Sequence, residues 1–318
     1  MTKRTFNVIK SIIKLNQLLI ESFCHMTYSK PRMMSIFTAL ALLTASNLQA
    51  EVLPQAVQGI KITLAKKPSS RPMTVAYVPS VKHYYIADGG LAPMASEFES
   101  ATSKSQVHAY NDAGKYINSA KPGYDNRSIY YNANTNKLET ITYNISSEVG
   151  FSPNTGIFSI DFADTGEVKD SSNEIMQFNP AFGHANTMPS YDAANKRYFA
   201  KQGRSAVVWI VDPSQREKVG AITLDLAKAG AAFDDISDSF VAFTGVKGEE
   251  LLVTDVDHKA ALVFDITGKF VAKSELPKEL KLHSQNHFNG LGYANNMLFV
   301  FNENEGEFGT YYGFKILK

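Results

Sequence analysis

Two histidines and several acidic or amide residues recur at matching places along the chain, a pattern that suits metal binding or acid–base chemistry. They lie six to nine residues before five aromatic residues, namely Tyr77, Tyr131, Tyr191, Phe243 and Tyr293. The candidates for ligand binding are Arg71, Tyr124, Asp125, His184, Asp234, Asp235, Asn286 and His287, with Ser70 beside the first. Imidazole and carboxylate groups together can hold a divalent cation or transfer protons. His184, Asp235 and His287 are therefore the weak candidates for a catalytic or metal site.

A plainer interpretation of this group is that its members are ordinary loop residues. Asp, Asn and His are frequent in loops, where their side chains bond the backbone. His283 and His287 stand four apart, but in a stretch without helical periodicity. The oxygen-rich segments 255–259 and 302–307 contain ligands that calcium prefers, although hairpin turns explain both. The cofactor is unknown, and a divalent metal such as calcium is the kind these residues suggest.

Other catalytic signatures are missing from the sequence. It contains no Gly-x-Ser-x-Gly elbow, no phosphate-binding glycine loop and no His-Glu-x-x-His motif. The single cysteine, Cys24, lies near the N-terminus, so residues 51–318 offer no thiolate for a redox centre or a metal. A long insertion over 88–104 mixes Gly, Pro and apolar residues, and such loops often serve recognition.

The elements that must position these residues repeat along the chain. Five segments read as a strand, a polar turn and a second strand, at 75–87, 129–141, 189–200, 241–253 and 291–300. Their aligned aromatic residues are 54, 60, 52 and 50 positions apart, which resembles the blade period of β-propellers with loop insertions. After each of the first four segments, a strand ends in Asp or Asn and a turn leads into another strand.

The sequence therefore predicts an all-β fold, a β-propeller of four-stranded antiparallel blades. Five blades are expected, or six if the stretch 145–185 hides another hairpin. The last unit has three evident strands, and the segment 59–64 can complete it as a fourth, which removes an exposed edge. A two-sheet sandwich is the competing all-β interpretation. Residues 224–233 suggest a turn or two of helix within a loop.

The strand–Asp–x–x–Gly units resemble those of the YncE-like and NHL-type bacterial β-propellers. The resemblance covers most of residues 59–318 and concerns the fold. It implies a rigid ring whose loops meet ligands at the central channel, and it leaves the activity open because such folds host many functions.

The first fifty residues read as a leader with a secretory signal peptide. A basic flank at Lys30 and Arg32 precedes an apolar run over 33–45, and a small residue, Ala50, ends the region. The run is too short for a permanent membrane span. The residues before it, up to residue 32, are either an extended basic region of the signal or, as we favour, the result of a start assigned too early. Six of the 32 basic residues and one of the 31 acidic residues lie here, so residues 51–318 carry 26 and 30.

We therefore expect a single propeller domain over 51–318 that is periplasmic or secreted, with no stable membrane anchor after cleavage. The nearly balanced charge of the chain gives no indication of a surface that binds nucleic acid. The predicted function is a binding module for a protein, a glycan or a small molecule. The alternative is a metal-assisted hydrolase, lactonase or lyase with its site at the central channel.

Overall fold

The computed structural model describes residues 51–68, 71–89, 105–123, 125–142, 156–177, 182–183 and 187–318. These residues belong to one compact unit, Gln49–Lys318. The predicted leader and signal peptide, and the insertion from residue 90 to 104, lie outside the described residues. Within the described ranges, no helix has the length and apolarity needed to cross a membrane.

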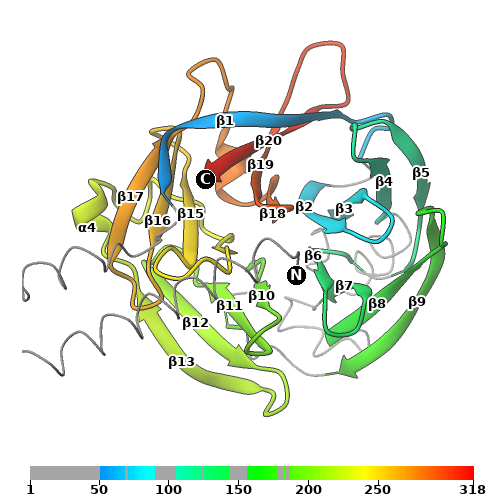
Figure 1. The fold of residues 1–318 in the computed structure, drawn as a ribbon, viewed down its shortest axis with the longest axis horizontal. Helices are drawn as coiled ribbons and strands as arrows, with labels where there is room; N and C mark the ends of the chain where they lie inside the picture. Colours follow the sequence, from blue (N-terminus) through cyan, green and yellow to red (C-terminus); the bar gives the residue numbers. More distant parts are fainter. Residues whose placement is uncertain are drawn as a thin grey trace, which may run out of the picture. The chain divides into compact units, whose positions relative to one another are not determined.

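The described chain is all-β and is built from repeated four-stranded antiparallel sheets, as a propeller requires (Figure 1). The first sheet contains β2 (Arg71–Val78), β3 (His83–Gly89), β4 (Val107–Asn111) and β5 (Tyr116–Ala120). The second contains β6 (Ser128–Asn132), β7 (Lys137–Thr142), β8 (Gly156–Phe162) and β9 (Val168–Gln177). The third contains β10 (Ser190–Asp192), β11 (Arg197–Lys201), β12 (Val207–Asp212) and β13 (Glu217–Thr223).

The remaining eight strands form one longer sheet, in the order β14-β15-β16-β17-β1-β20-β19-β18. Its first half is β14 (Ala242–Phe243), β15 (Leu251–Asp255), β16 (Ala260–Phe264) and β17 (Phe270–Glu275). Its second half is β18 (Leu291–Ala294), β19 (Met297–Asn302), β20 (Thr310–Leu317) and β1 (Val52–Thr63). The halves meet where Gln55 of β1 pairs in parallel with Glu275 of β17. Two short helices, α4 (Leu226–Ala229) and the 3-10 helix η1 (Ser284–His287), interrupt the loops.

All five predicted hairpins are present, as β2-β3, β6-β7, β10-β11, β14-β15 and β18-β19. The stretch 145–185 does hold a further hairpin, β8-β9, and β8 pairs with β7 in the second sheet. The suggested helical turn within 224–233 is also present, as α4. The hairpin signal succeeded because β-branched and aromatic runs alternate with turn residues that accept a left-handed backbone, such as Asn136 and Lys196.

The predicted Asp–Gly turns bond as expected at β16-β17. The Oδ1 atom of Asp265 accepts hydrogen bonds from the backbone N–H groups of Thr267 (2.8 Å) and Lys269 (3.1 Å). Gly268 follows with φ of 88°, a left-handed conformation that glycine adopts without strain. A Cβ atom on Gly268 would overlap the carbonyl oxygen of Thr223 at the end of β13. The glycine thus lets the turn of one sheet pack closely on the outer strand of the preceding sheet.

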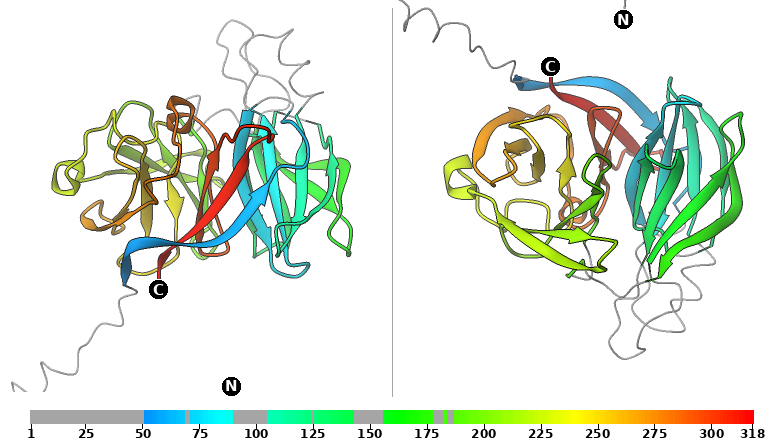
Figure 2. Two further views of the ribbon diagram at one scale, coloured as in Figure 1. Left: turned by 90° about the horizontal axis from the view of Figure 1, so that it is seen from above. Right: turned by 60° about the horizontal axis from the view of Figure 1, so that its bottom comes forward.

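The first described strand pairs with the last one. β1 runs antiparallel to β20, with Lys61 opposite Tyr312 and Ile62 opposite Tyr311 (Figure 2, blue beside red). The strand predicted at 59–64 therefore completes the sheet of β18, β19 and β20. Ile62 and Leu64 are buried in a core cluster that also contains residues of β2, β3 and β4.

The innermost strands of the sheets contact one another in the cyclic order β2, β6, β10, β14, β18 and back to β2. Each contact includes a hydrogen bond between segments at the strand entries or within the strands. The donor and acceptor pairs are Ile129 N and Thr74 Oγ1 (2.7 Å), Ser128 Oγ and Pro189 O (2.6 Å), Met188 N and Ser239 O (2.8 Å), Asp238 N and His287 O (2.8 Å), and Gly290 N and Pro72 O (2.9 Å). These hydrogen bonds hold neighbouring inner strands close to one another.

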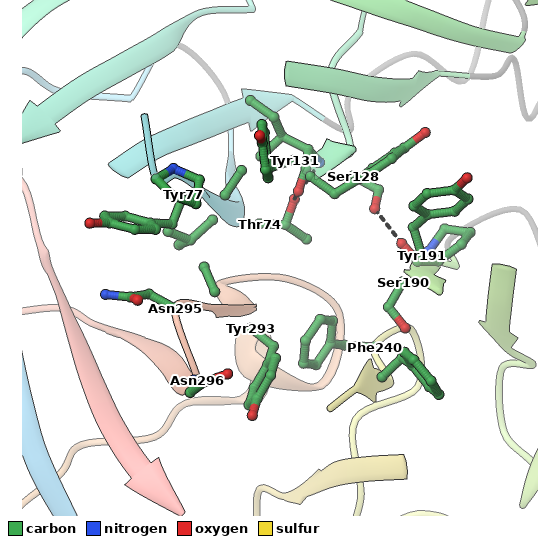
Figure 3. Close-up of a pocket in the computed structure, with 18 residues that line it drawn as sticks. Thr74, Tyr77, Ser128, Tyr131, Ser190, Tyr191, Phe240, Tyr293, Asn295 and Asn296 are labelled. Atoms are coloured by element: carbon green, nitrogen blue, oxygen red, sulfur yellow. Dashed lines mark hydrogen bonds between the residues drawn. The ribbon is translucent and has the colours of Figure 1, made fainter. Parts of the chain in front are cut away.

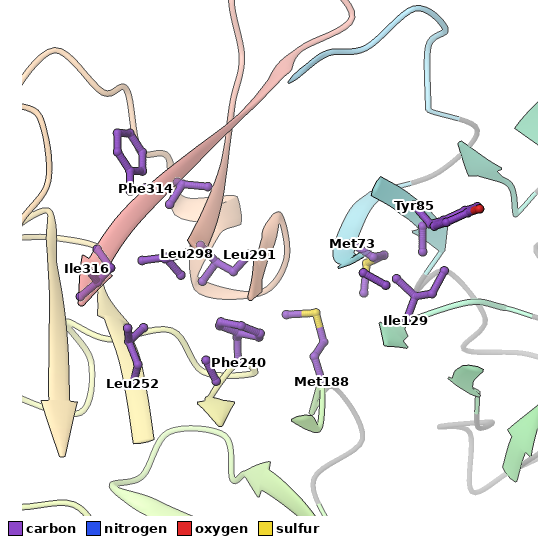
Figure 4. Close-up of a cluster of buried hydrophobic side chains, with 14 of the residues drawn as sticks. Met73, Tyr85, Ile129, Met188, Phe240, Leu252, Leu291, Leu298, Phe314 and Ile316 are labelled. Atoms are coloured by element: carbon purple, nitrogen blue, oxygen red, sulfur yellow. The ribbon is translucent and has the colours of Figure 1, made fainter. Parts of the chain in front are cut away.

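Apolar side chains fill the space among the entry halves of these strands. Met73, Met188, Phe240 and Leu291 are buried in the largest core cluster (Figure 4). The cluster extends outward along β19 and β20 through Leu298, Phe314 and Ile316. The interior between the inner strands is therefore a packed core at this level.

We predict that Gly268→Ala lowers the free energy of unfolding by more than about 2 kcal/mol, because a left-handed alanine costs about 1–2 kcal/mol and its Cβ also meets backbone. Gly245→Ala is the matched control, since Gly245 has φ of 74° and open space around its Cβ position. Urea unfolding followed by circular dichroism measures both variants. Equal losses for the two would contradict the proposed close packing of the turn.

Candidate functional site

A central cavity of about 360 Å³ lies among the five inner strands and takes side chains from each of them (Figure 3). Its wall begins at the first residues of β6 and β10 and reaches the turns that follow the inner strands, and Phe240 belongs both to this wall and to the packed core. Its lining residues are Thr74, Val75, Ala76, Tyr77, Pro79, Ser128, Ile129, Tyr130, Tyr131, Pro189, Ser190, Tyr191, Phe240, Phe243, Tyr293, Ala294, Asn295 and Asn296. Figure 3 shows the labelled side chains arranged around an open centre.

The five aligned aromatic residues of the sequence repeat are all in this lining. Tyr77, Tyr131, Tyr191, Phe243 and Tyr293 occupy β2, β6, β10, β14 and β18, and each is half-buried. One position of the repeat thus supplies one ring per inner strand. The rings stand at one level because each aromatic residue is the last or the second-last residue of its inner strand.

Several of these rings are held by a second aromatic ring behind them. Phe243 stacks on Phe199 of the neighbouring sheet, with centroids 5.0 Å apart and planes 11° apart. Tyr77 packs on Tyr84 at 4.7 Å. Tyr191 packs on Tyr198 of β11 at 4.8 Å. Aromatic pairs of this kind add about 0.5–1.5 kcal/mol beyond area burial, so the cavity wall is rigid.

A buried acidic network supports the wall at Tyr130. The hydroxyl of Tyr130 donates to Oε2 of Glu139 (2.7 Å) and lies 2.5 Å from the hydroxyl of Tyr198. Glu139 is only 2% exposed and also accepts hydrogen bonds from Asn132 and Thr135. Burial raises the pKa of Tyr130 well above its usual value, so this hydroxyl remains a donor to Glu139.

Among the described residues, the lining contains polar groups but no Asp, Glu, Lys, Arg or His. Burial raises the pKa of Tyr293 to about 12, and burial with the nearby Asp112 raises that of Tyr77. Both hydroxyls are therefore neutral at physiological pH. Two other cavities, of about 410 and 440 Å³, each lie between two neighbouring sheets and have charged residues such as Asp161 and Glu250 in their walls.

Two hydroxyl groups of the cavity lack a partner within the part of the chain that the structure describes. The Oγ atom of Ser190 is buried and makes no hydrogen bond. The hydroxyl of Tyr293 makes none to a described residue, and burial is the one cause of its pKa shift. Asn295 and Asn296 are exposed at the rim, where Asn295 donates to the hydroxyl of Tyr84 (2.8 Å). The Tyr293 hydroxyl and the rim amides can bond a bound molecule directly, whereas the enclosed Ser190 hydroxyl can do so by rotation about its Cα–Cβ bond.

The predicted site residues that the structure describes precede the inner strands or stand at their start, and none of them is in the described lining of this cavity. Tyr124 and His184 lie outside the described residues. Arg71 is exposed at the start of β2. Asp125 is buried and pairs with Arg127 at 3.2 Å, directly before β6. Because two members are not described, the predicted layer as a whole stays a prediction.

The other predicted residues gather around the loop before β14. Asp234 is exposed and lies 3.6 Å from Arg204. The carboxylate of Asp235 accepts from the backbone N–H of Ala232 (2.7 Å). Asn286 is buried, and its side chain donates to the carbonyl of Phe301 (3.0 Å). These bonds are those of loop residues that stabilise backbone.

His287 lies next to the loop before β14. Its Nδ1 is 3.2 Å from the carbonyl oxygen of Ile236, and its Nε2 is 3.1 Å from Oδ1 of Asp257. Oxygen partners at both ring nitrogens leave neither as a ready metal ligand. Within the described ranges, no group of three His, Cys, Asp or Glu side chains is arranged to hold a metal ion.

The segment 255–259 is a hairpin turn with an acid–histidine pair. His258 Nδ1 lies 3.0 Å from Asp255 and 4.0 Å from Asp235. The hydrogen bond to Asp255 raises the pKa of His258, and burial raises the pKa of Asp255. The acidic segment 302–307 is likewise bonded within itself, with Asn304 and Thr310 donating to Glu307.

A serine, a histidine and an aspartate also meet in the first sheet. His108 Nδ1 lies 2.7 Å from Ser119 Oγ, and Nε2 lies 3.3 Å from Asp88 Oδ2. This order resembles a hydrolase triad in composition, but His108 is 1% exposed and is absent from the lining of the described cavities. We interpret it as a structural network across β3, β4 and β5.

Sequence reasoning used the five aromatic residues as alignment markers and missed that they line a cavity. Their recurrence at one position of each repeat was the available signal. Ser190 left no signal, because its lack of a partner depends on neighbours from other strands.

No protein-family model and no curated protein matches the chain. Among solved structures, the tail fiber of Staphylococcus aureus phage P68 is similar at 12% identity with a TM-score of 0.44, over 82% of this chain and 53% of that one. Chaetomium thermophilum Raptor is similar at 12% identity with a TM-score of 0.34, over 85% of this chain and 22% of that one. The chain thus spans about half and about a fifth of these proteins.

We predict that His108→Ala destabilises the fold by about 3 kcal/mol, because it removes a large buried side chain together with its hydrogen bonds to Ser119 and Asp88. His108→Gln, which keeps a nitrogen donor near the Nε2 position, loses less. Urea unfolding measures both. Equal stability of wild type and His108→Ala, together with loss of an ester-hydrolysis activity, would instead support a catalytic triad.

Proposed function

We propose that the chain is an exported five-bladed β-propeller that binds a ligand in its central cavity. The observation that carries the proposal is a cavity to which all five inner strands contribute. Ligand sites are concave, mostly preformed, and about 300–1,000 Å³ in volume, with apolar walls and a few placed polar groups. The aromatic wall and the available hydroxyls of Ser190 and Tyr293 fit that description.

The cyclic contacts of the inner strands support five blades in one ring. The hairpin β8-β9 belongs to the sheet of β6 and β7, which argues against a sixth blade within 145–185. β1 supplies the fourth strand of the last blade, a closure that joins the first and last described strands and protects an edge. The strand–Asp–Gly units that resemble YncE-like and NHL-type propellers are consistent with this architecture.

Export is supported by the sequence of the leader. A basic flank, a short apolar run and a terminal small residue form a secretory signal. Residues 51–318 lack cysteine, which suits a compartment where stray thiols oxidise.

We predict that residues 1–50, fused to alkaline phosphatase in a bacterial host, give an active reporter, because that enzyme acquires its disulfides only after export. Leu42→Arg in the apolar run abolishes the activity. Thr2→Arg, outside the run, is the control and retains it. An inactive wild-type fusion that accumulates in the cytoplasm would refute export.

For the cavity, we predict that ligand-observed NMR with a set of neutral, anionic and cationic small molecules finds binders among the neutral ones. Tyr293→Ala, which removes one wall of the cavity, abolishes their binding. Phe308→Ala is the control, since Phe308 is 50% exposed and absent from the lining. Binding that persists in Tyr293→Ala, or no binding at all, would count against the cavity as the site.

A further inference from the structure

We propose that the central cavity binds a neutral sugar ring, such as one unit of a glycan. This inference rests on the proposed function, because it names the class of ligand for the same cavity. Three properties of the wall carry it: supported aromatic faces, available hydroxyl and amide groups, and the absence of charge.

The aromatic rings supply faces on which a sugar can stack. The face of a sugar ring presents C–H bonds that are slightly positive, and the face of an aromatic ring is negative. Tyr77, Tyr191 and Phe243 are each backed by a further ring, so they keep their orientation without a ligand. A wall that is already rigid loses little conformational entropy when it binds.

The polar groups suit the hydroxyl groups of a sugar, which both donate and accept hydrogen bonds. A buried hydroxyl without a partner is costly, and native proteins rarely leave one. The Ser190 Oγ atom is in this state within the described chain. Tyr293 adds a second hydroxyl, and the amides of Asn295 and Asn296 stand at the rim. A ligand with several hydroxyl groups satisfies all of them together.

The neutrality of the lining argues against charged ligands. An anion or an ammonium group that entered the cavity would lose water and find no opposite charge among the described lining residues. A quaternary ammonium group can be held by aromatic faces alone, but it would leave the Ser190 and Tyr293 hydroxyls unused. The volume of about 360 Å³ is at the low end for ligand sites, which suits one ring or two.

The test is isothermal titration of the full chain with methyl glycosides of glucose, galactose, arabinose and N-acetylglucosamine, and with choline and acetate as charged probes. We expect at least one glycoside to bind with a dissociation constant on the order of 1 mM, as the size of a single sugar allows. Choline and acetate should not bind.

Variants that keep the fold sharpen the test. Ser190→Ala and Tyr293→Phe each remove one hydroxyl and should weaken sugar binding about fivefold. Thermal melting should show that Ser190→Ala is as stable as wild type or more stable, because it removes a buried hydroxyl that has no partner. Tyr312→Phe, on β20 and outside the lining, is the matched control and should bind as wild type does.

The outcomes separate the two proposals. Neutral fragments that bind in the cavity while no glycoside binds would overturn the sugar and leave the binding function standing. Choline binding in place of sugar, insensitive to Ser190→Ala, would also overturn it. A cavity that binds neither glycosides nor fragments would overturn both proposals.

Discussion

The pairing of β1 with β20 is the contact on which the rest of the arrangement depends. The C-terminal part of the chain supplies three strands to its sheet, so the fourth must come from the beginning of the described chain. Ile60 and Ile62 of that strand also pack into the core that holds Tyr84 and Tyr110 of the first sheet. Gly114 lies against the same strand, where a Cβ would be 2.6 Å from the carbonyl oxygen of Lys61. β1 therefore joins the last sheet to the first, and without it both sheets would expose apolar faces.

Because β1 joins the last sheet to the first, the inner strands surround a central space that only side chains can fill. Large apolar residues such as Met188 and Phe240 pack the entry halves, and hydroxyl groups of Ser and Thr bridge neighbouring strands there. Toward the exit ends, rings on successive strands pack on neighbours within and between sheets, and a hollow remains among them that also reaches Thr74, Ser128 and Phe240. The cavity is thus a consequence of which side chains stand at each level of the same five strands.

The sequence predicted much of this arrangement because its signals are local. The turn after Asp265 and the hairpins at 75–87 and 291–300 depend on residues that are close together in the sequence. The separation between successive hairpins can also be read directly from the sequence. The strand at 59–64 could be matched to the last unit because that unit lacked one strand. The central cavity could not be predicted in this way. Counting back from the aromatic residues identified the loops at the entry, whereas the hollow depends on the combined volume of side chains from five distant segments.

The neutrality of the cavity also depends on how the fold treats the charges behind its wall. Glu139 bonds the wall residue Tyr130 but is itself absent from the lining, and Tyr130, Asn132 and Thr135 all donate hydrogen bonds to its carboxyl group. These donors satisfy the carboxyl oxygens behind the wall, so the cavity side presents a tyrosine ring. A buried acid thus fixes the position of a ring, while the surface that a ligand meets remains uncharged. Such a wall can be rigid and still select for ligands that have hydroxyl groups and no net charge.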